Sequence, residues 1–152
     1  MTLLRAIARP MLASTFVVGA ARALKDPEAQ AVRAKPVTDR VVPLLQRAAP
    51  GLPVPSNPAT WVRINGAVQI VGAGMLATGR FPRLAAAVLA GSMVPTTVAG
   101  HAFWAEPDPK ARAAQRIHFF KNVSTTGGLV MVALDRPPAR KKSTSKSKKA
   151  AG

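Results

Sequence analysis

The sequence contains no cysteine and no tyrosine, and it has only two histidines and six acidic residues among 152 positions. Without cysteine, the chain forms no disulfide, no thiolate metal site and no thiol redox centre of its own. The six acidic residues all lie outside the long apolar runs: Asp26, Glu28, Asp39, Glu106, Asp108 and Asp135. We therefore predict no catalytic residue, no metal site and no intrinsic cofactor.

Charge and apolar character are separated along the chain. The formal net charge is +16, which is typical of nucleic-acid binders, yet 48% of the residues are hydrophobic. Seven of the 22 basic residues lie within residues 136–152, and most of the others fall between apolar runs. A soluble protein spreads its charge at helical spacing, whereas a membrane protein excludes charge from whole segments. The pattern favours a membrane protein over a nucleic-acid binder.

Four apolar segments, at about 3–24, 63–79, 84–102 and 117–134, have the length of short membrane spans. Helices of this size are about 24–33 Å long, close to the ~30 Å hydrocarbon core. The second is rich in glycine, which weakens a soluble helix but allows close helix packing in lipid. We predict an all-α integral membrane four-helix bundle in residues 1–135, followed by a disordered basic tail, 136–152.

The connections between the segments differ in length. The four residues Arg80-Phe81-Pro82-Arg83 predict an antiparallel hairpin of the second and third segments. The segment 25–62 is a proline-rich loop, within which Val37–Ala49 has the spacing of an amphipathic helix. That helix either lies in the membrane interface or packs on the ends of the bundle. Phe103-Trp104 is expected to anchor the chain at the interface.

Four spans place both termini on one side of the membrane. The basic tail favours the cytoplasmic side of a bacterial plasma membrane, where it would bind anionic lipid headgroups, although the loop 25–62 also carries basic residues. Arg5 and Arg9 ahead of the apolar Met11–Ala20 run, with Ala21-Arg22-Ala23 after it, also imitate a cleaved signal peptide. The three later segments favour a retained first helix.

Polar residues inside the apolar segments are the candidates for ligand binding, since such residues are costly in lipid. The fourth segment carries several at helical spacing, and the second and third add amides and hydroxyls. If they face inward, they form a cationic polar pocket suited to an anionic or carbonyl-bearing ligand, such as a quinone head group or a lipid phosphate. The pocket residues are Arg63, Asn65, Gln69, Thr96, His118, Lys121 and Asn122.

The same residues also have a purely structural interpretation, which the sequence leaves open. Arg63 and Lys121 lie near segment ends, where long basic side chains reach to the headgroups. His118 is also consistent with a packing residue that forms a hydrogen bond. Asn65 and Gln69 are also consistent with hydrogen-bonded links between helices.

Several stretches resemble the DoxX family. The run RPMLASTFVVG (Arg9–Gly19) resembles its opening helix, and VRINGAVQIVGAGMLATGR resembles its glycine-rich second helix. The stretches AGSMVPTTVAGHAFW and HFFKNVSTTGGL look like actinobacterial-type members. The resemblance extends over about Arg9–Asp135, and the lysine-rich tail lies outside it.

The resemblance implies a small four-helix membrane protein. The family is named for a subunit associated with a thiosulfate:quinone oxidoreductase, and some bacterial members are linked to membrane complexes that handle oxidative and thiol stress. It therefore implies a non-catalytic subunit or scaffold of a redox or oxidative-stress complex, with redox or sulfur-handling proteins as partners. The alternative is a quinone- or lipid-binding membrane protein, either an oxidoreductase subunit or a small-molecule carrier. Without cysteine, an enzymatic role would depend on a partner or a bound quinone.

Overall fold

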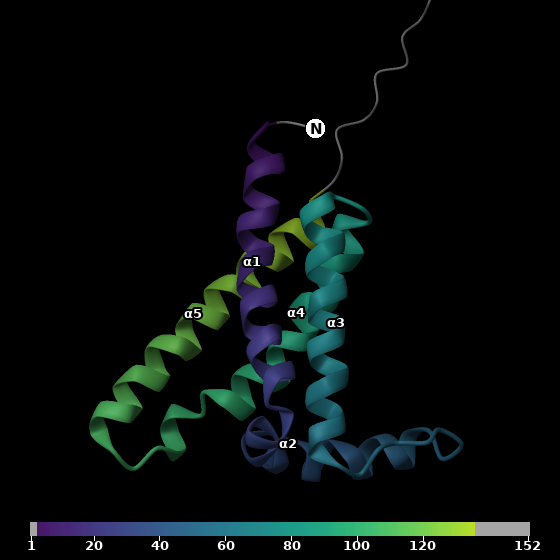
Figure 1. Cartoon of the computed structure of the whole chain (residues 1–152), viewed down its shortest axis with the longest axis vertical. Coiled ribbons are helices and arrows are strands. Elements are labelled where there is room, and N and C mark those ends of the chain that lie inside the picture. Colours follow the sequence, from purple (N-terminus) through teal and green to yellow (C-terminus); the bar gives the residue numbers. More distant parts are fainter. Residues whose placement is uncertain (1–2, 136–152) are drawn as a thin grey trace, which may run out of the picture.

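The computed structural model describes residues 3–135 (Figure 1). The predicted disordered tail, 136–152, lies outside the described residues. Within them the chain is all-helical and contains no strand, which confirms the predicted α class. The elements in order are α1 (Leu3–Lys25), α2 (Pro27–Ala48), α3 (Pro58–Thr78), α4 (Pro82–Gly100), the short 3₁₀ helix η1 (Phe103–Ala105) and α5 (Pro109–Leu134).

Three of the five α-helices begin with the same local signal, an Asx residue followed by proline. Asp26, Asn57 and Asp108 each accept a hydrogen bond from a backbone N–H of the first turn of α2, α3 and α5. The side chain satisfies a donor that has no partner within the helix, and the following proline has no donor to satisfy. These signals place the starts of α3 and α5 ahead of the predicted positions 63 and 117, because hydropathy marks the apolar part of a helix and not its first turn.

The segment 25–62, predicted as a loop with one helix at Val37–Ala49, instead contains the long helix α2. Pro36 and Pro43 lie inside α2, where each removes one backbone donor without ending the helix. Of its residues only Thr38 is buried. α2 crosses one end of the molecule and packs against α3 and α4 (Figure 1). These contacts favour the second of the two expected placements, on the ends of the bundle.

The other four helices are joined in a chain of neighbours. α1 packs along α3, α3 along α4, and α4 along α5, whereas α1 and α5 have only a small contact. Among the described helices, α3 has no contact with α5, and α1 has none with α4. The predicted α3–α4 hairpin is confirmed, and it turns at Gly79, whose φ of 70° lies in the left-handed region that glycine adopts without strain.

Alanines share the interior with a few large residues, and many large apolar residues lie on the surface. The buried cluster shared by the four helices consists of four alanines and five larger residues: Ala13, Phe16, Ala73, Leu76, Ala85, Ala86, Leu89, Met93 and Leu129. Meanwhile Met11, Val71, Val94 and Met131, one on each of the four helices, are 60–75% exposed. A water-soluble protein rarely exposes so much apolar surface, whereas small residues at helix contacts are typical of helices in lipid.

Two helical stretches are long and apolar enough to cross a membrane by themselves, Leu3–Lys25 and Pro82–Ala105. α3 carries Arg63, Asn65 and Gln69, and α5 carries four basic residues in its first half, and neither helix is among these two stretches. At the end of the second stretch, Phe103 and Trp104 pack edge-on against Phe119 of α5, with ring centroids 5.4 and 5.7 Å apart.

Candidate functional site

The first polar group lies between α3 and α4. Asn65 Nδ2 donates to Thr96 Oγ1 at 3.0 Å, and Gln69 Nε2 donates to Thr96 Oγ1 at 3.3 Å and to Ser92 Oγ at 3.5 Å. The two hydroxyls in turn donate to carbonyl oxygens of α4, Thr96 to Ser92 and Ser92 to Leu89. Gln69 is only 5% exposed, so these bonds satisfy a buried amide and at the same time hold α3 to α4.

The second polar group lies between α4 and α5. Asn122 Nδ2 donates to Thr97 Oγ1 at 3.1 Å, and both side chains are buried. Towards the end of α4, the ring of His101 stacks on that of His118 with centroids 5.2 Å apart. His101 Nδ1 also lies 2.7 Å from Gln115 Oε1. This group links the end of α4 to about two turns of α5.

The two groups are separate because α4 lies between α3 and α5. Thr96 and Thr97 are consecutive and therefore point about 100° apart around α4, one towards α3 and the other towards α5. Gln69 and Asn122 therefore bond to different faces of α4, and no described hydrogen bond joins them. Five of the seven predicted residues thus fall into two hydrogen-bonded or stacked groups, and whether either group binds a small molecule stays a prediction.

The predicted cations are also apart. Arg63 forms an ion pair with Glu28 of α2 at 3.1 Å, with both side chains more than half exposed. Lys121 is exposed on α5, where it and Arg33 lie close enough to interact electrostatically with His101. Arg63 therefore fixes α2 to the start of α3, and the cationic surface around His101 forms without it.

Sequence reasoning missed Thr97 and Gln115 as members of the second group. Each has a signal in the spacing: Thr97 lies four residues before His101, and Gln115 lies three before His118, so each pair shares one helix face. That spacing identifies a polar face, although it does not say which helix the face meets.

The chemistry of the α3–α4 group fits a structural link better than a quinone site. A quinone carbonyl needs a hydrogen-bond donor, but both N–H groups of Gln69 and the hydroxyl protons of Ser92 and Thr96 are used within the protein. A quinone would have to displace a bond between helices. Within residues 3–135 no three histidine, aspartate or glutamate side chains come together in a metal-binding group.

An all-helical molecule with small and polar residues inside and large aliphatic residues outside has the features of a helical membrane protein. Comparison with known families identifies it further. Residues 4–102 match the DoxX family, so the chain belongs to this membrane-associated family. The match includes α1 to α4 and ends before α5, short of the Asp135 limit expected from the resemblance. Neither the curated proteins nor the solved structures include a match to the chain.

Proposed function

We propose that the chain is a multi-pass membrane protein in which α1, α3, α4 and α5 all cross the bilayer. The observation that carries this proposal is the exposed aliphatic surface on each of the four helices, with alanine and glycine at their contacts. The helices α3 and α5 bury their amides against α4, which removes polar groups from the lipid. The apolar part of α5, residues 117–134, is about 27 Å long as a helix, near the thickness of the hydrocarbon core.

The proposed orientation places the first residue of α1 and the last of α5 on the cytoplasmic side of a bacterial plasma membrane. These two ends lie together at one end of the molecule, opposite α2 (Figure 1). The turn between α3 and α4 lies at the same end and adds Arg80 and Arg83 to the basic residues of segment 136–152. Basic residues favour the cytoplasmic side of short connections.

Within the membrane, we propose that the protein is a non-catalytic subunit that helps to assemble a redox or oxidative-stress complex. The helix α2 provides the docking surface. Arg33, Arg40 and Arg47 are exposed and recur every seven residues, so they form one stripe along α2, about 10 Å apart. Because α2 lies across the end of the bundle instead of in the lipid-facing layer, this stripe is accessible to a protein with an acidic surface.

Affinity purification from native membranes in mild detergent tests this assignment. We expect redox or sulfur-handling proteins to co-purify with the full chain, and to be lost when Arg33, Arg40 and Arg47 are all replaced by glutamine. We expect the amount of recovered partner to fall at least tenfold. Each charge at the rim of a protein interface contributes modestly to binding, and the three contributions have the same direction. The matched control is Lys35→Gln on the same helix. Lys35 forms an ion pair with Asp39 and does not belong to the arginine stripe.

Recovery of the same partners by the triple variant would show that they dock elsewhere. A reproducibly partnerless protein would contradict the subunit proposal itself, without affecting the membrane arrangement.

A further inference from the structure

A cavity of about 330 Å³ lies at the end of the molecule opposite α2, between the start of α1, the start of α4 and the end of α5. None of the candidate residues discussed above lines it. Its lining residues are Arg5, Arg9, Phe81, Pro82, Arg83, Leu84, Val132 and Asp135. Two helices that are far apart in sequence, α1 and α4, thus bring three arginines to one hollow, and the end of α5 adds Asp135.

Two of the three arginines are held by contacts with the end of α5. Arg5 forms an ion pair with Asp135 at 3.0 Å, which joins the first turn of α1 to the end of α5. Arg83 Nε donates to the carbonyl oxygen of Ala133 at 2.9 Å, and this bond directs its guanidinium group across the hollow from α4 to α5. The lining contains three arginines and one aspartate, so its formal charge is positive, which favours an anion.

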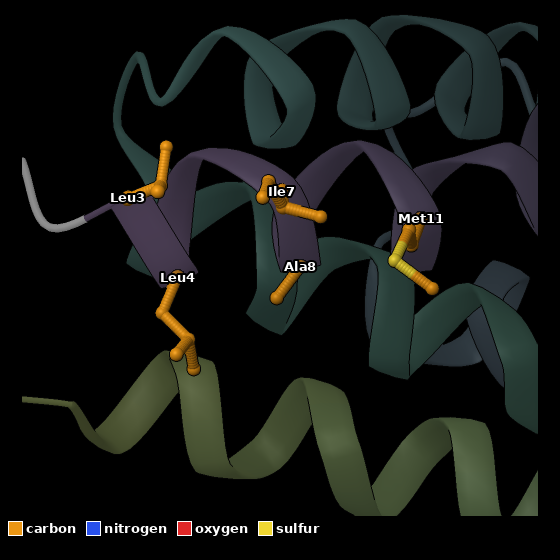
Figure 2. A pocket seen from close by; sticks show the side chains of 5 residues that line it. All are labelled: Leu3, Leu4, Ile7, Ala8 and Met11. Atoms are coloured by element: carbon orange, nitrogen blue, oxygen red, sulfur yellow. The ribbon is translucent and has the colours of Figure 1, made fainter.

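The remaining walls are apolar, and a second, apolar hollow lies along the same turns of α1. Phe81, Leu84 and Val132 line the cavity beside the arginines. On the outer side of the first three turns of α1, a hollow of about 340 Å³ is lined by aliphatic side chains alone (Figure 2): Leu3, Leu4, Ile7, Ala8 and Met11. Leu4 and Ala8 immediately precede Arg5 and Arg9, and Leu4 points towards α5 (Figure 2).

We propose that the cavity binds the phosphate headgroup of an anionic phospholipid, with an acyl chain along the aliphatic hollow of α1. The planar guanidinium groups suit a phosphodiester because each can donate two parallel hydrogen bonds to its oxygens. A soluble anion would use the arginines but not the aliphatic hollow, whereas a phospholipid uses both. This inference rests on the proposed membrane arrangement, in which the cavity lies at the cytoplasmic surface, where anionic lipids attract basic side chains.

The test uses the purified full chain in neutral detergent micelles, with thermal unfolding followed as phosphatidylglycerol or phosphatidylcholine is added. We expect phosphatidylglycerol to raise the unfolding temperature and phosphatidylcholine to raise it much less, because a ligand that binds only the folded state stabilises it. Arg9→Gln combined with Arg83→Gln should weaken the phosphatidylglycerol effect by about twentyfold to thirtyfold, roughly fivefold for each arginine. The matched control, Arg22→Gln with Arg116→Gln at the other end, should keep it.

A variant that is expected to raise lipid affinity distinguishes lipid binding from a purely structural role of the arginines. Asp135→Asn removes the negative charge and the ion pair with Arg5. If the cavity binds a headgroup, phosphatidylglycerol affinity should rise by about fivefold, because the negative charge that pairs with Arg5 is removed. If the arginines serve only to hold the helices together, Asp135→Asn and the double variant should both lower stability and leave lipid preference unchanged.

Three results would overturn the site: weaker binding by Asp135→Asn, unchanged binding by the double arginine variant, or equal stabilisation by inorganic phosphate. Segment 136–152 is present in every variant, so its attraction to lipid cancels in the comparison. Recovery of the protein from cells without detergent would contradict the bilayer arrangement, whereas loss of lipid selectivity in a membrane-inserted protein would contradict the headgroup site alone.

Discussion

Replacing Val71 with aspartate is expected to lower the amount of membrane-inserted protein about a hundredfold. Val71 is 62% exposed and lies midway between the basic residues Arg63 and Arg80 at the two ends of α3. A carboxylate at the centre of a membrane helix costs about 2.5–3.5 kcal/mol on insertion scales, and about 1.4 kcal/mol corresponds to a factor of ten. On a surface that faces water, the same substitution would change stability by no more than about 0.5 kcal/mol.

The matched control is Val32→Asp, the same substitution at a position of α2 that is 75% exposed. Because α2 crosses the end of the bundle, this carboxylate remains in contact with water, and we expect wild-type levels in the membrane fraction. Both variants are measured as the fraction of protein that sediments with membranes after alkaline washing. Equal levels for the two variants would mean that the exposed face of α3 is not in contact with lipid.

Gly72→Leu should destabilise the folded protein by about 1–3 kcal/mol or more. A Cβ atom at Gly72 would lie 3.0 Å from Cγ and Cδ2 of Leu89, whose side chain is fully buried between the helices. Three further carbon atoms would have to enter the same contact, so α3 and α4 would be forced apart. The close approach of these helices depends on the missing side chain, as expected where packing drives helix association.

Gly74→Leu provides the comparison, since it makes the same chemical change two residues later on the same helix. No atom lies within 4 Å of a Cβ at Gly74, and the position is exposed. We expect its stability to equal or exceed that of the wild type, because leucine favours the helix more than glycine does. Thermal unfolding of the purified variants in detergent measures the difference. Similar midpoints for the two variants would rule out the tight contact at Gly72.

The sequence predicted the helical class and the α3–α4 hairpin because both depend on local features. Apolar runs set the helices, and four residues between two runs leave room only for a turn. The starts of α2, α3 and α5 were misplaced because they are set by capping pairs such as Asn57-Pro58, which hydropathy does not record. A pattern search for Asx-Pro would have found all three.

The candidate site was harder to predict because spacing defines a helix face but not its neighbour. The faces carrying Gln69 and Asn122 were correctly recognised as polar, and each is hydrogen-bonded to a threonine of α4. That α4 separates them is a property of helix arrangement, which depends on packing between distant segments. The partner of Arg63, Glu28, lies 35 residues away in a segment expected to be a loop, so no local pattern could have linked them.

The most direct test of the membrane arrangement uses the absence of cysteine, which makes any single introduced cysteine the only labelling site. Ser56→Cys lies between α2 and α3, Arg80→Cys in the turn at the opposite end, and Val71→Cys between them on α3. In sealed right-side-out vesicles, we expect a membrane-impermeant maleimide to label Ser56→Cys at once, Arg80→Cys only after the vesicles are opened, and Val71→Cys in neither case. Labelling of Ser56→Cys and Arg80→Cys from the same side, or rapid labelling of Val71→Cys, would contradict the bilayer-spanning bundle.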